Sequence, residues 1–497
     1  MSGEVDRFQH GAALATLLGD WSTGDGPLYR KLADAIAAAA DDGSLVPGER
    51  LPAERELARV LAVSRSTVVA AYEELRGRGV VDRRQGSGTK VNDRRRPRHS
   101  DGRVRGGRGT AIMQRLIDGP GRLISLGYAA DAGVPEVAEA LREVADHDIT
   151  DLLHDAGYHP RGLPALREVV ARHYTNRGLP TSPDQVLVTT GAHQALVLLA
   201  EVYLRGASSV AVEVPSWAPC LDIFRQHGVR LVPVGLDAEG IDVRALAEVL
   251  TRTRPALLYV MPTFHNPTGR LMSATRRRQV AELAARHEVA VVEDNAYVGH
   301  SLTVDEEALP APLAAYAPES GEVLTVDSLK GLWAGLRVGW VRGPAGIIER
   351  CARRKAMADL GSPLIEQAVA ARLVPRLAEL SRARGVVQRR RLAELERLLR
   401  QRLPEWTWTP PDGGSSLWVR LPGGHSADVY AQLALRHGVE VIPGSTMDPT
   451  GGHDDHFRIP FVRPPEELEE LVCRLASAWT ELVRHGPHED LPLRPVV

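Results

Sequence analysis

Cysteine is scarce in this chain, and long apolar runs are missing from it. Three cysteines, Cys220, Cys351 and Cys473, stand far apart among 497 residues and form no CxxC pair. That pattern predicts neither a disulfide framework nor a zinc site, so we expect no bound metal. No stretch reaches the ~18 apolar residues of a membrane-spanning helix, and the N-terminus lacks the basic start and apolar core of a signal peptide. We therefore expect a cytoplasmic protein without a membrane partner.

Net charge is also small, but the basic residues are unevenly distributed. The formal net charge at pH 7 is −2. Residues 76–98 nonetheless hold nine Lys and Arg residues against two Asp residues. A local basic patch indicates a nucleic-acid partner better than the overall charge does. At 497 residues the chain is also too long for one ordinary domain, because domains of ~150 residues are usual.

Residues 24–91 have the pattern of three helices followed by a hairpin. Apolar residues recur at intervals of four along Leu28–Ala40, and shorter helices are expected over Ala53–Leu61 and Arg65–Arg76. Two short strands then flank a basic, glycine-rich tip at residues 83–88. Helices joined by a tight turn and followed by a basic hairpin predict a winged helix-turn-helix domain.

This segment resembles the GntR-type winged helix. The stretches PGERLPAERELARVLAVSRSTVVAAYEELRGRGVV and RRQGSGT carry the resemblance. It implies that the helix beginning at Arg65 reads double-stranded DNA in the major groove, while the hairpin tip approaches the minor groove. The residues that the resemblance places at the DNA are Arg55, Arg65, Ser66, Thr67, Gln85, Gly86, Ser87 and Gly88.

Residues 92–121 are predicted to form a flexible linker. They contain eight Arg and six Gly with little periodicity, and a random coil of this length reaches roughly 30 Å. After the linker, short β-rich runs alternate with helical patterns, which predicts an α/β fold with a mainly parallel sheet covered by helices on both faces. The expected strands are Val186–Thr189, Val210–Val214, Leu257–Met261, Val289–Glu293, Val323–Val326 and Leu336–Val341.

The pattern changes near residue 374. Long helices rich in Arg and Leu come first, and a glycine-punctuated α+β stretch follows them. We therefore expect a large domain over residues 122–373 and a smaller C-terminal subdomain over residues 374–497.

Lys330 lies in the run KGLWAGLRVGW, seven residues before Arg337. A lysine that forms a Schiff base must lose its proton near neutral pH, and a cationic arginine disfavours a charged lysine while suiting a phosphate group. The pair resembles the pyridoxal-phosphate lysine and the phosphate-binding arginine of fold-type I aminotransferases. An isolated K-x6-R spacing is a weak signal, so its weight depends on the other motifs.

Motifs for the cofactor phosphate and ring occur earlier in the chain. The segment TTGAHQAL resembles the helix start whose free N–H groups bind the phosphate. Tyr158 in YHPRGLPALR resembles the tyrosine that crosses a dimer interface to that phosphate. Trp217 in VPSWAP resembles the aromatic side chain that stacks on the pyridine ring. The residues implied at the helix start are Gly191, Ala192 and His193.

Motifs for the remaining cofactor atoms and for a substrate follow in order. Asn266 in HNPTG and Tyr297 in EDNAY resemble the two partners of the phenolic oxygen. Asp294 resembles the partner of the pyridine nitrogen, whose protonated form a carboxylate favours. Arg458 in HFRIPF resembles the arginine that binds a substrate α-carboxylate as a bidentate fork.

The residues just before Lys330 depart from the family pattern. A Ser or Thr usually stands three residues before the lysine, whereas this chain has Asp327-Ser328-Leu329. An Asp in the phosphate site would repel the phosphate. Either Ser328 supplies the hydroxyl group or phosphate binding is weakened.

A GntR-type head joined to such a body resembles the MocR family of transcriptional regulators. The resemblance implies pyridoxal 5'-phosphate as cofactor, a small amine or amino-acid effector or the cofactor itself as signal, and a head-to-tail homodimer with each head on the partner's body. Two alternatives remain open. One is a working aminotransferase with an accessory DNA-binding head, and the other is a DNA-binding protein whose body has lost its cofactor.

Overall fold

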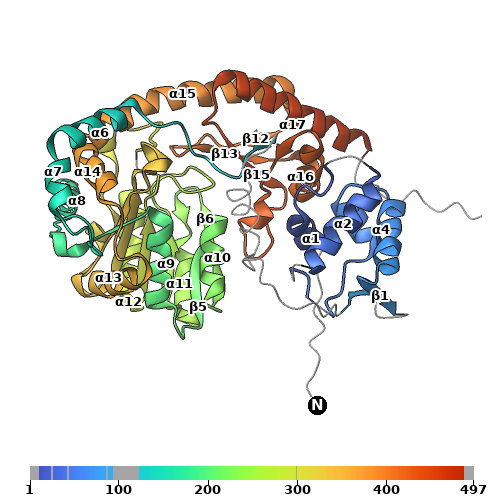
Figure 1. Cartoon of the computed structure of the whole chain (residues 1–497), viewed down its shortest axis with the longest axis horizontal. Coiled ribbons are helices and arrows are strands. Elements are labelled where there is room, and N and C mark those ends of the chain that lie inside the picture. The colour runs from blue at the N-terminus through green and yellow to red at the C-terminus, as the bar shows by residue number, and fades with distance from the viewer. Residues whose placement is uncertain are drawn as a thin grey trace, which may run out of the picture.

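The computed structural model describes residues 11–23, 26–41, 44–46, 48–84, 88–92, 123–297 and 299–485. Along the chain it consists of an N-terminal head, a large part built on an eight-stranded sheet, and a small C-terminal part (Figure 1). The predicted linker at 92–121 lies almost wholly outside the described residues. No helix among the described residues is both long and apolar enough to cross a membrane.

The head is a winged helix-turn-helix, as expected. It contains α1 (Gly11–Leu18), α2 (Leu28–Asp41), α3 (Glu54–Val60), α4 (Arg65–Gly77) and the antiparallel hairpin of β1 (Val81–Arg84) and β2 (Gly88–Val91). Helix α4 begins where the Ser64 hydroxyl accepts a hydrogen bond from the N–H of Thr67 at 3.1 Å. The apolar faces of the helices meet in a core of their own, with Leu32, Leu57 and Leu75 fully buried.

The large part contains the predicted, mostly parallel sheet. The strand order is β4-β11-β10-β9-β8-β5-β6-β7, in which β11 and β7 run antiparallel to their neighbours. All six expected strands are present within a few residues, and two more were not expected. The strands are β4 (Val186–Thr189), β5 (Ser209–Val214), β6 (Arg230–Asp237), β7 (Gly240–Ile241), β8 (Leu257–Val260), β9 (Ala290–Asp294), β10 (Val323–Ser328) and β11 (Gly339–Arg342).

Helices cover both faces of this sheet because its central strands are apolar on both sides. In β8, Leu257 and Tyr259 face a core that is shared with α9 (Ala192–Tyr203), α10 (Ala218–Gln226) and α13 (Ala345–Asp359). The alternate residues Leu258 and Val260 face the opposite core. That core includes side chains of α11 (Val243–Thr253) and α12 (Ala274–Arg286).

A third helical layer flanks the β4 end of the sheet. It consists of α6 (Pro135–His147), α7 (Ile149–His154), α8 (Pro164–Asn176) and α14 (Leu364–Leu373). Tyr174 of α8 is fully buried there and accepts a hydrogen bond from the indole of Trp340 at 2.9 Å.

The small part packs three helices on a three-stranded sheet. The helices are α15 (Leu377–Arg402), α16 (Ala427–Arg436) and α17 (Pro465–His485), and the strands are β12 (Thr407–Trp408), β13 (Ser416–Arg420) and β15 (His456–Pro460). A separate pair of strands joins β3 (Ile124–Ser125) to β14 (Val439–Glu440) in parallel. Leu126 is therefore buried in the small part's core. The first residues of the predicted 122–373 domain thus pack with the small part. Local sequence patterns cannot reveal this contact, because β3 and β14 are far apart in the chain.

The head lies against the small part of its own chain. Helix α3 contacts α16, and the indole of Trp21 donates to the side chain of Gln432 at 3.3 Å. Figure 1 shows α1 near α16, with α4 on the side of the head away from the body. The expected placement of each head on a partner's body concerns a second chain and remains a prediction.

Candidate cofactor site and DNA-reading helix

Lys330 lies at the carboxyl edge of the large sheet. It follows β10 in a short turn (Leu329–Gly331), and Tyr297 follows the parallel neighbouring strand β9. The two side chains therefore meet, with the Lys330 Nζ donating to the Tyr297 hydroxyl at 3.3 Å and lying 4.6 Å from the ring centre. This edge is where open α/β sheets bind their ligands.

Tyr297 also contacts Asn266, the other residue expected at the phenolic oxygen. The amide of Asn266 donates to the Tyr297 hydroxyl at 3.4 Å. Burial would raise the pKa of Tyr297, but the charges of Lys330 and Arg458 outweigh it and lower that pKa below its ordinary value. The hydroxyl accepts hydrogen bonds from Lys330 and Asn266 within a cationic surrounding.

Asp294 ends β9 and is 2% exposed. Its carboxylate accepts hydrogen bonds from the Tyr259 hydroxyl at 2.6 Å and the Ala296 N–H at 3.0 Å. Burial raises the pKa of Asp294, and these bonds and the more distant Lys330 only partly offset it. A buried carboxylate whose charge is only partly compensated is a suitable partner for a cationic group such as a protonated ring nitrogen. Tyr259 was missed in the sequence because a tyrosine in an apolar strand carries no distinct signal.

The expected phosphate end forms around the start of α9. Gly191 has a φ of +98°, and a Cβ there would lie 3.3 Å from the Arg337 guanidinium, so the position favours glycine. Arg337 donates to the carbonyl of Thr190 at 2.6 Å. Ala192 and His193 form the first turn of α9. The pKa of His193 is lowered mainly by burial and to a smaller extent by the charge of Arg337. Free N–H groups, a guanidinium and a neutral imidazole together suit a phosphate.

Asp327 and Ser328, which depart from the family pattern before Lys330, lie on opposite faces of β10. Leu324 and Val326 of β10 pack in the same core as α9. Because side chains alternate along a strand, Ser328 is on that face and Asp327 is on the opposite one. On that face the charge of Asp327 lies near the buried Tyr174. The pKa of Tyr174 is raised mainly by burial, and the charge of Asp327 raises it further. The geometry supports Ser328 as the residue that supplies the hydroxyl group.

Arg458 of β15 is 3% exposed and lies beside Asn266. Its guanidinium donates to the Asn266 side chain at 3.3 Å, and to the carbonyls of Leu126 at 3.2 Å and Gly127 at 2.8 Å. The buried Nε has no partner among the described residues. A guanidinium fixed in this way, with a donor still unused, suits a ligand carboxylate.

Two expected cofactor residues lie farther out. The ring of Trp217 packs edge-on against His193, with centroids 5.9 Å apart, so it borders the phosphate end. Tyr158 is 70% exposed and is not brought to the site within one chain. An exposed position is compatible with the expected contact across a dimer interface.

Of the residues expected at DNA, Arg65, Ser66 and Thr67 form the start of α4, whereas Arg55 lies in α3 and Gly88 begins β2. Arg55, Arg65 and Ser66 are exposed, and Arg65 forms an ion pair with Glu54 at 3.2 Å. Thr67 is half-buried beside the N-cap Ser64. Gly88 has a φ of +78° and a Cβ there would collide with the Arg50 side chain, so the wing needs glycine at this position. Gln85, Gly86 and Ser87 lie outside the described residues.

Within the described ranges, no three His, Cys, Asp or Glu side chains gather in a group that could hold a metal ion.

Two protein-family models match the chain. The model described as aminotransferase class I and II covers residues 126–475, and the model described as bacterial regulatory proteins, gntR family, covers residues 28–91.

Individual proteins support both matches. YisV, an uncharacterized HTH-type transcriptional regulator of Bacillus subtilis, is 31% identical over 85% of this chain and 90% of its own. The probable rhizopine catabolism regulatory protein MocR of Rhizobium meliloti is 28% identical over 84% of this chain and 87% of its own. LysN of Thermus thermophilus, an α-aminoadipate aminotransferase solved with N-(5'-phosphopyridoxyl)-L-leucine, is similar with a TM-score of 0.66 and 29% identity, over 76% of this chain and 98% of its own.

The sheet and the side chains around Lys330 define a fold-type I aminotransferase-like body joined to a GntR-type winged helix. The chain belongs to the aminotransferase class I and II family over most of its length. More narrowly, it has the architecture of the MocR-type transcriptional regulators. Pyridoxal 5'-phosphate is the cofactor that this body implies, and the geometry around Lys330, Asp294 and Arg458 fits that group.

Proposed function

We propose that this protein is a cytoplasmic, pyridoxal-phosphate-dependent transcriptional regulator that binds an amino-acid effector in its body and changes its DNA affinity in response. A direct contact between the body and the helix-turn-helix carries this proposal. The guanidinium of Arg436, at the end of α16, donates to the carbonyls of Leu61 at 2.9 Å and Ala62 at 2.6 Å. These two residues join α3 to the DNA-reading helix α4, so a movement of α16 acts on that helix directly.

Helix α16 approaches the cofactor site at its other end. Asp428, in its first turn, accepts a hydrogen bond from Ser445 at 2.8 Å. Two residues further on, the carbonyl of Met447 accepts a hydrogen bond from the N–H of Ser216 at 2.8 Å. Ser216 precedes Trp217, which borders the phosphate end. One helix and two hydrogen-bonded turns therefore connect the cofactor site to the head, and chains of packed and hydrogen-bonded residues of this kind carry coupling between distant sites.

The cofactor supplies an electron-withdrawing ring to an amine bonded to it. Lys330 would hold it covalently, because its amine donates to the Tyr297 hydroxyl, which Asn266 also contacts. Asp294 would face the ring nitrogen. A positive charge on that nitrogen would offset the free-energy cost of burying the carboxylate. The phosphate would be held by the start of α9 together with Ser328 and Arg337.

The effector is an amine that also carries a carboxylate. Its amine would compete with Lys330 for the cofactor, while the unused Nε of Arg458 would bind the carboxylate. An effector shifts an equilibrium only if it binds one state more tightly. Arg458 can supply that difference, because it joins β15 of the small part to Asn266 of the large part at 3.3 Å.

We further propose a homodimer in which Tyr158 reaches the partner's cofactor site. Large apolar side chains are exposed in the segments before Tyr158 and around residue 361: Leu153, Met357, Leu360 and Ile365 are 77%, 90%, 57% and 43% exposed. The Tyr158 segment lies against the turn after Leu360, since a Cβ on Gly361 would be 3.0 Å from the carbonyl of His159. A second copy would cover this surface.

The test compares Arg436→Ala, Arg436→Lys and the control Arg402→Ala in the full-length protein. The probe is whichever common L-amino acid most changes the visible spectrum of the protein. We expect Arg436→Ala to keep the visible absorption but to lose the effect of the probe on DNA affinity, with partial recovery in Arg436→Lys. Arg402 is exposed at the end of α15, so its variant should respond like the parent. An undiminished response in Arg436→Ala would contradict the proposal.

A working aminotransferase is the second candidate, and the complete set of Lys330, Tyr297, Asn266 and Asp294 favours it. In that case the purified protein would convert amino acids to keto acids at ordinary enzyme rates, about 1–1000 per second. DNA affinity would then be indifferent to the amino acid. Measuring keto-acid release and DNA binding in the same sample separates the two functions.

A further inference from the structure

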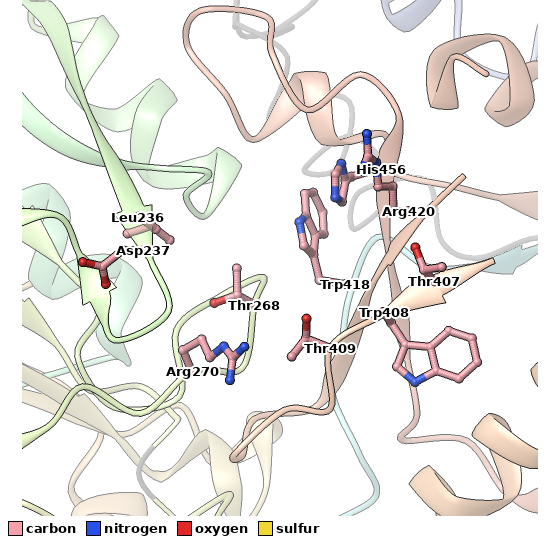
Figure 2. Close-up of a pocket in the computed structure, with 10 residues that line it drawn as sticks. All are labelled: Leu236, Asp237, Thr268, Arg270, Thr407, Trp408, Thr409, Trp418, Arg420 and His456. Carbon is pink, nitrogen blue, oxygen red and sulfur yellow. The ribbon is translucent and has the colours of Figure 1, made fainter. Parts of the chain in front are cut away.

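A cleft separate from the cofactor site lies between the large and small parts. Its volume is about 270 Å³. Leu236, Asp237, Thr268 and Arg270 line it from the large part, and β12, β13 and β15 line it from the small part (Figure 2). Ligand pockets for drug-sized molecules begin near 300 Å³, so this cleft suits a smaller molecule, about one ring with one polar substituent.

The cleft and the cofactor site are lined by different residues of the same structures. In the turn after β8, Asn266 bonds Tyr297 in the cofactor site, whereas Thr268 lines the cleft. On the sheet of the small part, Arg458 pairs directly with Trp418, so their side chains share one face. Arg458 belongs to the cofactor site and Trp418 to the cleft. Neither Lys330 nor Asp294 is among the residues that line the cleft.

The charge in the cleft is positive and has one uncompensated source. Asp237 is already paired with Arg276 at 2.8 Å, and Arg420 with Asp455 at 2.6 Å. Within the part of the chain that the structure describes, the guanidinium of Arg270 has neither a hydrogen bond nor an ion pair. It is half-buried, and Figure 2 shows it pointing toward the space between the two parts. An anion is the ligand group that this arrangement favours.

The small part supplies a flat aromatic wall. The indole of Trp418 and the imidazole of His456 are stacked, with centroids 5.2 Å apart and planes 16° from parallel. Burial lowers the pKa of His456 despite the adjacent Asp455, so the imidazole is uncharged near neutral pH. Flat rings pack well on such a surface.

We propose that this cleft binds a small planar carboxylate, such as an aromatic acid, with its ring on Trp418 and its carboxylate on Arg270. The ligand would join the large part to the small part, because the two residues belong to different parts. The lining of this site shares no residue with the cofactor site, so the proposal does not rest on the function proposed for that site.

Titration calorimetry on the full-length, cofactor-loaded protein tests the proposal, with three matched probes. Benzoate has both the ring and the charge, benzamide lacks the charge, and acetate lacks the ring. We expect saturable binding of benzoate with a Kd of about 10 mM or tighter. Benzamide should bind at least about tenfold more weakly because it lacks the charge-assisted hydrogen bond, and acetate should do so because it lacks the ring that packs on Trp418.

Substitutions of single arginines test where benzoate binds. Arg270→Gln should weaken benzoate about tenfold or more, whereas Arg252→Gln, an exposed arginine on α11 outside the cleft, should leave it unchanged. Benzoate could also bind the cofactor-site arginine, so Arg458→Gln is measured beside them. Affinity that survives Arg270→Gln but disappears in Arg458→Gln would overturn the proposal. So would the absence of saturable benzoate binding to the parent protein.

Discussion

Asp327 and Ser328 are neighbours in β10, yet they lie on opposite faces of the sheet. Ser328 shares its face with Val326 and α9, whereas the charge of Asp327 acts on Tyr174. The aspartate that stands in the usual place of a serine is thereby kept away from the phosphate end. Strand alternation explains how the chain tolerates this departure from the family pattern.

The first prediction follows from these two faces. Ser328→Ala should weaken retention of pyridoxal phosphate by about 10-fold or more, because a hydrogen bond to a charged group contributes ~1.5–3 kcal/mol. Asp327→Asn should change retention little. Equilibrium dialysis of each variant against free cofactor measures both. A larger loss in Asp327→Asn than in Ser328→Ala would show that the assignment is reversed.

The second prediction concerns pH and stability. Glu213 is 1% exposed, accepts a hydrogen bond from the N–H of Met261 at 2.7 Å, and lies 3.6 Å from His265. Burial raises the pKa of Glu213 to about 8, against the opposing effect of the Met261 bond, from an ordinary value of 4.5. Between these two values the folded chain keeps a proton that the unfolded chain has released. The free energy of unfolding therefore falls as pH rises through this window.

Glu213→Gln should remove that part of the pH dependence, because glutamine keeps the acceptor for Met261 and does not titrate. We expect the melting temperature of the parent to fall more steeply than that of the variant between about pH 5 and pH 8. Differential scanning calorimetry across this range measures both slopes. Parallel curves would mean that Glu213 does not hold the proton.

Lys330 and Arg337 could be proposed as site residues from the sequence because their motif is local, with Arg337 seven residues after Lys330. The strands could be predicted for the same reason, since β4, β5, β8 and β10 are short apolar runs of β-rich residues. Other features depend on distant parts of the chain. The contact between Arg436 and Ala62 joins residues 374 positions apart, and the pairing of β3 with β14 is just as remote. No local pattern of charge or hydrophobicity marks such a contact.

The third prediction concerns DNA reading. Arg65→Ala should weaken binding to a specific operator by ~1–3 kcal/mol, because a base-reading arginine contributes about that much. Its exposed ion pair with Glu54 contributes little to folding. The control is Arg30→Ala, an exposed arginine on α2. Fluorescence anisotropy with labelled operator measures both, and equal affinities for Arg65→Ala and the parent would refute the assignment of α4 as the reading helix.

We expect chemistry at Lys330 to change DNA binding by the head. The most direct measurement is operator affinity with and without the amino acid that changes the visible spectrum, in the parent and in Lys330→Ala. We expect a change of about 5-fold or more in the parent, the usual range of coupling between sites. In Lys330→Ala we expect no visible absorption of bound cofactor and no change in DNA affinity. An equal response in both proteins, or a parent that turns over amino acids with constant DNA affinity, would contradict the proposed regulation through Lys330.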